Sequence, residues 1–71
     1  MTDEMKDKEY LEINLPPYLR EDIDNLQEGR RLNLRYRLDG LYNEVQSSIN
    51  VAFYKGSIDK EQADWLRKKY L

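Results

Sequence analysis

The stretch RRLNLRYRL, residues 30–38, decides the fold because it fits two kinds of secondary structure. Its apolar residues alternate with polar ones, which is the period-2 pattern of a strand. Those apolar residues are Leu32, Leu34, Tyr36 and Leu38. Turned at about 100° per residue, however, Leu34 and Leu38 fall in phase with the apolar residues that follow. These are Leu41, Val45, Ile49 and Ala52. Because the helical phase explains the longer run, we predict a helix over residues 34–54.

The alternative is a strand at residues 32–38 that ends in a turn at Asp39-Gly40 and pairs with residues 10–15. Leu11, Ile13 and Leu15 also alternate with polar residues, so residues 10–15 are predicted to be extended. A two-stranded ribbon is marginal in water unless it packs on helices. This α+β alternative stays open.

Two further helices are predicted from their ends. Pro16-Pro17 ends the extended segment and opens a helix over residues 17–28, since proline is tolerated in a first turn. Gly29 fits the C′ position after that helix. The last helix, residues 59–70, begins with Asp59 as N-cap and Gln62 in the capping-box position. Its apolar stripe is Ala63, Leu66 and Tyr70, and Ile58 can pack on Ala63 as a hydrophobic staple.

The predicted fold class is therefore all-α, a small three-helix bundle with an extended N-terminal segment. We expect residues 1–9, which are mostly charged, to form a disordered tail. Residues 10–71 then make a single helical domain. With 71 residues, the chain is near the lower limit for a lone hydrophobic core.

Composition excludes several kinds of site. The chain has no cysteine and no histidine, so it can form neither disulfides nor the usual zinc, haem or iron–sulfur centres. We expect no cofactor and no metal. The longest apolar run, residues 51–54, is too short to span a bilayer, and no signal-peptide core is visible. We therefore expect a cytoplasmic protein that does not enter membranes.

Catalytic chemistry is not expected either. General acid–base catalysis at neutral pH most often uses histidine, and nucleophilic catalysis pairs a nucleophile with a base. Ser47, Ser48 and Ser57 have no such partner that the sequence identifies, and no glycine-rich phosphate loop is present. We predict that the chain is not an enzyme.

Nucleic-acid binding is the alternative function, carried by the basic stretch Arg30–Arg37. On a strand, Arg31, Arg35 and Arg37 would share one face and could contact successive phosphates. On a helix, Arg35 and Arg37 point about 160° apart, so the patch is lost. The net charge of −2 also disfavours this function.

Protein binding is the remaining class of function. On the predicted middle helix a second row of residues lies away from the main apolar stripe. The row consists of Tyr36, Gly40, Ser47, Val51 and Tyr54. It could dock a partner, but a central helix that touches both neighbours also needs a wide face, and the pattern favours that interpretation. Trp65, with Lys69 one turn later, could seal the edge of the core or could be an exposed anchor for a partner.

Three segments carry a resemblance to known proteins. They are YLEINLPPYLREDI (residues 10–23), QSSINVAF (residues 46–53) and IDKEQADWLRKKYL (residues 58–71). They resemble small uncharacterised bacterial proteins, which are often encoded on conjugative or other mobile elements. The resemblance implies a bacterial cytoplasmic accessory protein and supplies no catalytic motif. The predicted function is accordingly non-catalytic, that of a protein-interaction or regulatory accessory module whose partner is another protein or a second copy.

Overall fold

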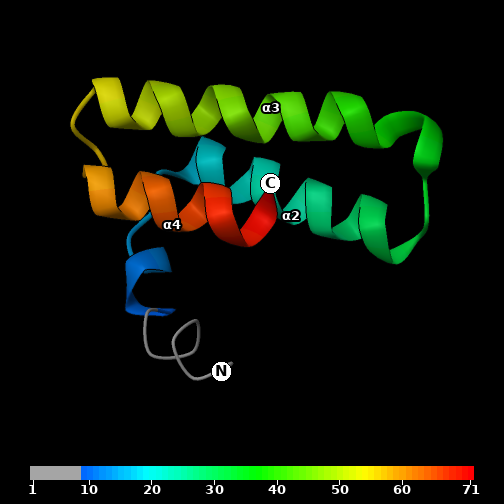
Figure 1. The fold of residues 1–71 in the computed structure, drawn as a ribbon, viewed down its shortest axis with the longest axis horizontal. Coiled ribbons are helices and arrows are strands. Elements are labelled where there is room, and N and C mark those ends of the chain that lie inside the picture. Colours follow the sequence, from blue (N-terminus) through cyan, green and yellow to red (C-terminus); the bar gives the residue numbers. More distant parts are fainter. Residues whose placement is uncertain (1–8) are drawn as a thin grey trace.

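A computed structural model describes residues 9–71 as three α-helices preceded by a short 3-10 turn. The elements are η1 (Glu9–Glu12), α2 (Pro17–Arg31), α3 (Arg35–Tyr54) and α4 (Lys60–Tyr70). Helix α3 runs along one long side of the bundle, and both α2 and α4 pack against it (Figure 1). The described part of the chain contains no strand. The predicted all-α three-helix bundle is confirmed, and the α+β alternative is wrong.

The stretch over residues 30–38 divides into a helix end, a turn and a helix start. Leu32 caps α2, and Asn33 adopts a left-handed conformation with φ of 57°. The N–H of Asn33 donates to the carbonyl of Arg30 (3.1 Å), and that of Leu34 donates to Gly29 (2.9 Å). This pair of bonds is a Schellman motif, and α3 begins one residue later at Arg35. The alternative strand over residues 32–38 does not form. The helical periodicity continues into α3, and burial of the apolar side of α3 favours the helix.

Gly29 has a different role from the predicted helix cap. Helix α2 continues past it to Arg31, and Asn33 takes the left-handed C′ position. Gly29 is instead buried where α2 meets α3, and a Cβ atom built on it would overlap the Cδ1 atom of Leu41. The glycine therefore allows the two helices to approach closely.

The predicted extended segment over residues 10–15 is also wrong. The chain forms the η1 turn, in which the N–H of Ile13 donates to the carbonyl of Tyr10 (3.2 Å). Leu11 is buried at 5% exposure, whereas Ile13 is 61% exposed. The alternation of apolar residues gave a wrong prediction because, of Leu11 and Ile13, only Leu11 enters the core. Residues 1–8 of the predicted tail lie outside the described residues, and Glu9 begins η1.

Local capping sets the other helix ends. The capping box of α4 is confirmed, with Gln62 N donating to Asp59 Oδ1 (2.8 Å) and Asp59 N to Gln62 Oε1 (3.1 Å). Gly56, with φ of 76°, ends α3 in a second Schellman motif. These polar contacts compensate backbone groups that a helix end would leave unpaired.

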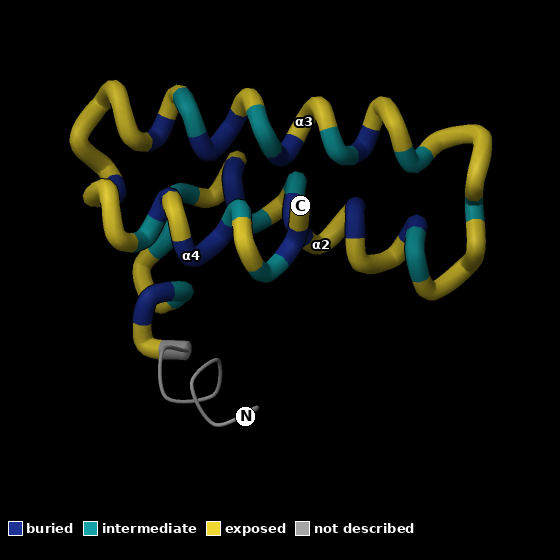
Figure 2. Tube along the Cα trace, viewed as in Figure 1, coloured by how far each residue is buried: buried dark blue, intermediate teal, exposed yellow. Residues whose placement is uncertain are grey.

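The core lies on the sides of the helices that face one another (Figure 2). Its fully buried large side chains are Leu19, Ile23, Leu26, Val45, Ile49 and Leu66. Within the described residues, no helix has both the length and the apolar character to cross a bilayer.

Candidate functional site

The side of α3 that points away from the core carries the two most exposed large hydrophobic side chains of the described residues. Tyr36 is 85% exposed and Tyr54 is 87% exposed. They are 18 positions apart, which is five full turns at 3.6 residues per turn, so both project from the same side. Figure 2 shows exposed positions repeating along this side of α3.

Between the two tyrosines lies a row of small or amide side chains, which together with them we name the outer stripe. The outer stripe consists of Tyr36, Gly40, Asn43, Ser47, Asn50, Val51 and Tyr54. All are exposed except the half-buried Asn50. The interpretation favoured from sequence, that this row packs between neighbouring helices, is wrong. Helices α2 and α4 pack mainly on the opposite side of α3, where Val45, Ile49 and Ala52 are buried. At the edge of the stripe, Arg67 Nη2 of α4 donates to Asn50 Oδ1 (2.7 Å).

The outer stripe contains no charged residue, although 37% of the chain is charged. Charged side chains of α3 lie at its edges instead. At about 100° per residue, Arg37 and Glu44 lie along one edge and Arg35 and Asp39 along the other. The sequence pattern pointed to the tyrosines and small residues of the stripe. It missed Asn43 and Asn50, because polar residues add nothing to an apolar periodicity.

Trp65 and Lys69 lie away from the outer stripe, on α4. Trp65 is only 5% exposed, so the interpretation as an exposed anchor is wrong. Lys69 Nζ lies 4.8 Å from the centre of the Trp65 ring, as the edge-sealing alternative requires. The Nε1 atom of Trp65 is buried and has no hydrogen-bond acceptor among the described residues.

A cluster of polar contacts around Glu12 joins η1 to α4 and α2, and we name it the Glu12 clasp. Glu12 accepts hydrogen bonds from Lys69 Nζ and from the hydroxyl of Tyr70 (2.5 Å). Arg20 Nη1 lies 3.7 Å from the same carboxylate. Gln62 Nε2 also donates to the carbonyl of Leu11 (3.1 Å). Trp65 lies between Gln62 and Lys69 along α4, so η1 is held against the face that carries the tryptophan.

The Glu12 clasp changes the titration of two α4 side chains. Burial raises the pKa of Tyr70, and the hydrogen bond to Glu12 raises it further. Burial alone would lower the pKa of Lys69, but its hydrogen bonds to Glu12 and Tyr70 outweigh that effect and raise it. Both side chains are held in their protonated forms, as a structural contact between η1 and α4 requires.

The arginines of residues 30–37 do not gather into one patch. Arg31 pairs with Glu28, with Nη2 2.5 Å from Oε2. Arg35 and Arg37 are exposed on different sides of the first turn of α3. Arg30 is half-buried and donates to the Tyr42 hydroxyl (3.1 Å) and to the Tyr70 carbonyl. The structure therefore does not bring Arg31, Arg35 and Arg37 together.

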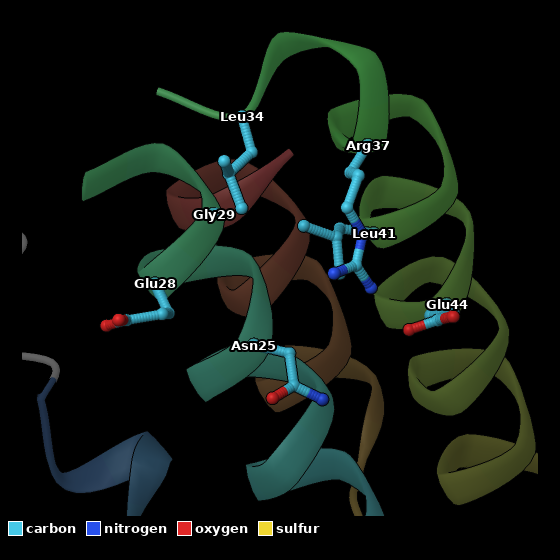
Figure 3. A pocket seen from close by; sticks show the side chains of 7 residues that line it. All are labelled: Asn25, Glu28, Gly29, Leu34, Arg37, Leu41 and Glu44. Carbon is cyan, nitrogen blue, oxygen red and sulfur yellow. The ribbon is translucent and has the colours of Figure 1, made fainter. Parts of the chain in front are cut away.

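An open hollow of about 320 Å³ lies where the end of α2 meets the start of α3. It is lined by Asn25, Glu28, Gly29, Leu34, Arg37, Leu41 and Glu44. Figure 3 shows Arg37 reaching towards Leu41, while Glu28 points away from the hollow and Glu44 lies on the other side of it, on α3. A catalytic or ion-binding site requires charged groups that converge on one point. The charged groups of this hollow do not converge.

Comparisons with models of protein families, with curated proteins and with solved structures found no match for this chain.

Proposed function

We propose that this chain is a non-catalytic protein-interaction module, acting as a regulatory accessory protein, and that it binds its partner through the outer stripe of α3. The observation that carries the proposal is the placement of Tyr36 and Tyr54 at the two ends of an uncharged helix face. A tyrosine offers a large rigid apolar surface together with a hydroxyl that can form hydrogen bonds. Such residues are enriched among the few that dominate binding energy at protein interfaces.

The absence of charge within the outer stripe supports the same function. Burying an ionised side chain without a partner is costly, whereas small residues and amides lose little on desolvation when their hydrogen bonds are met. The exposed surfaces of α2 and α4 carry many ionised side chains, such as Glu21, Asp24, Lys60 and Glu61. Docking on the stripe therefore involves a smaller desolvation cost than docking on either of the other helices.

Nucleic-acid binding is the weaker candidate, because Arg31 is paired with Glu28 and the exposed arginines of α3 diverge. A titration of labelled DNA and RNA at low and moderate salt tests it. The comparison is with a variant in which Arg31, Arg35 and Arg37 are alanine. Salt-dependent binding that this variant loses would favour nucleic acid over protein as the ligand.

The bacterial cytoplasm is the location that we propose, and a mobile element is the proposed genetic origin. Both rest on the resemblance of residues 10–23, 46–53 and 58–71 to small bacterial accessory proteins.

The protein-interaction function is tested by affinity capture from an extract of the native host. A double variant, Tyr36→Ser with Tyr54→Ser, should capture at least about tenfold less partner than the wild type does. The reason is that interface anchors contribute more than about 1 kcal/mol each to binding. Tyr10→Ser is the matched control, because Tyr10 is an exposed tyrosine on η1 rather than on α3. Circular dichroism checks that both variants remain folded. Equal capture by the double variant and the wild type would contradict the proposal.

A further inference from the structure

The turn η1 is held on the bundle through three kinds of contact. Leu11 is buried, and its carbonyl accepts a hydrogen bond from Gln62 Nε2 (3.1 Å). The carboxylate of Glu12 accepts from Lys69 Nζ and from the Tyr70 hydroxyl (2.5 Å). In Figure 1, η1 lies beside α4, on the opposite side of that helix from α3. The bundle therefore recognises an apolar side chain, the carbonyl of the same residue, and a carboxylate on the next residue.

The surface that receives η1 is shared between two helices, and we name it the η1 seat. It consists of Arg20 of α2 and of Gln62, Trp65, Lys69 and Tyr70 of α4. Gln62, Trp65 and Lys69 are spaced i, i+3 and i+7, so they share one face of α4. The capping box fixes the Gln62 side chain, whose Oε1 atom accepts from the N–H of Asp59 (3.1 Å). The donors of the seat are therefore held in place by the helix itself.

We propose that the η1 seat is a docking site for a segment of a partner protein that presents an aliphatic side chain followed by a carboxylate. In this proposal η1 is the internal competitor of that segment, and the partner binds when η1 leaves. The chemistry of the segment is defined by what the seat holds in the structure, which is Leu11 and Glu12 in a single turn. The seat is separate from the outer stripe, so this inference goes beyond the proposed function.

The polar groups of the seat select for a carboxylate. Arg20, Lys69 and the Tyr70 hydroxyl all face the carboxylate of Glu12. A partly buried ion pair adds little net stability compared with an apolar contact of similar size. It strongly disfavours a ligand without the matching charge, because the cations would then lose their partner. These contacts therefore contribute more to selectivity than to attachment.

Release of η1 leaves no charge enclosed in the core. The side chains of Arg20 and Lys69 are 43% and 28% exposed while η1 is in place. Water can therefore solvate both cations once η1 has left, and the Tyr70 hydroxyl loses only a partner that water can replace. The seat can thus remain intact without its internal ligand.

The turn itself is weakly held. Tyr10 and Ile13 are largely exposed, so η1 buries mainly the side chains of Leu11 and Glu12. Its own backbone is closed by the bond from the N–H of Ile13 to the carbonyl of Tyr10 (3.2 Å). A 3-10 turn of this length has little stability of its own. We therefore expect η1 to detach in a local step while the three helices stay folded.

The connection between η1 and α2 sets the strength of the competition. Residues 13–16 join the two elements. A connection this short keeps η1 beside the seat at an effective concentration of about millimolar. A partner segment in solution must displace it, so the affinity of the intact chain for that segment is lowered. Removing the contacts of η1 should raise this affinity.

Titration of Trp65 fluorescence with a synthetic peptide tests the site. The probe is EYLEINL, the sequence of residues 9–15, and EYLQINL is its uncharged control at position 12. In the variant Leu11→Ser with Glu12→Gln, which we name the vacated variant, EYLEINL should bind at least about tenfold more tightly than in the wild type. The vacated variant should bind EYLQINL at least about tenfold more weakly than EYLEINL, since it loses hydrogen bonds to a charged group.

Matched variants locate the binding. Tyr10→Ser with Ile13→Ser changes only exposed side chains of η1 and should bind EYLEINL as the wild type does. In the vacated variant, Lys69→Gln should weaken binding at least about tenfold. Lys60→Gln removes the same charge from the first residue of α4, where Lys60 pairs with Asp64, and should leave binding unchanged.

Circular dichroism and thermal melting check that each variant is folded. If the vacated variant is unfolded, Glu12→Gln alone carries the same comparison, and failure of both to fold would overturn the proposal because η1 would then be part of the bundle. Equal binding of the two peptides, or no binding up to about 10 mM, which exceeds the effective concentration of η1, would also overturn it. So would a wild-type dimer that Glu12→Gln dissociates, because the occupant would then be η1 of a second copy. Capture through the outer stripe is measured separately, so either proposal can fail alone.

Discussion

Gly29 and Gly40 lie only eleven positions apart, yet their surroundings differ completely. Gly29 is buried in α2 against Leu41, whereas Gly40 lies in the open on the outer side of α3. In both helices glycine is less favourable than alanine by about 1 kcal/mol. What decides the effect of a side chain at each position is therefore the space around it.

Alanine substitution should change stability in opposite directions at these two glycines. Gly40→Ala should stabilise the fold by about 0.5–1 kcal/mol, because the new methyl group meets no atom. Gly29→Ala gains the same helix propensity, but overpacking against Leu41 costs about 1–3 kcal/mol, so we expect a net loss of about 1 kcal/mol. Urea unfolding of both variants measures the difference, and a stabilised Gly29→Ala would show that Leu41 can move aside.

At the scale of the elements, η1 depends on contacts made far away in sequence. Glu12 is held by Lys69 and Tyr70 of α4 and by Arg20 of α2. A four-residue 3-10 turn has little stability of its own. Its position over the Trp65 face therefore depends on the Glu12 clasp and on the burial of Leu11.

Loosening of the Glu12 clasp can be observed directly because the chain has one tryptophan. Glu12→Gln should lower the free energy of unfolding by about 1–2 kcal/mol, since it removes the charge that Lys69 and Arg20 face. It should also shift Trp65 fluorescence to longer wavelength and increase quenching by acrylamide. Glu21→Gln, at an exposed position of α2, is the control. An unchanged spectrum in Glu12→Gln would show that Leu11 alone holds η1 in place.

At the scale of the whole molecule, polar contacts near the end of α4 connect every element. Arg30 of α2 donates to the Tyr70 carbonyl and to Tyr42 of α3, while the Tyr70 hydroxyl reaches Glu12 of η1. The chain has no cysteine, so disulfides cannot restrain it. Packing against α4 and these contacts together hold the bundle closed.

Stability should fall at alkaline pH because of this arrangement. The pKa values of Tyr70 and Lys69 are raised above their ordinary values of 10.0 and 10.5, so the folded state binds these protons more tightly than the unfolded state. Their contribution is fully present below about pH 10 and is lost as pH rises through the folded values. Urea unfolding between pH 8 and 11 measures the decline, which should be shallower in Tyr70→Phe. Tyr36→Phe, at an exposed position, should follow the wild type, and equal slopes for all three would contradict the prediction.

Local patterns in the sequence determined the three helices, the capping box of Asp59 and Gln62, and most of the core. Helical periodicity and capping depend on residues three or four positions apart, which a sequence displays directly. The same periodicity selected Tyr36, Gly40, Ser47, Val51 and Tyr54 as one row.

Only the tertiary structure decided whether that row was covered or exposed. It also decided that Trp65 is buried, that Gly29 lies at a contact between two helices, and that η1 is a turn rather than an extended segment. A helix with apolar or aromatic residues on two sides does not specify which side its neighbours occupy. That choice depends on how α2, α4 and η1 pack together, and the contacts involved join residues up to 58 positions apart, such as Glu12 and Tyr70.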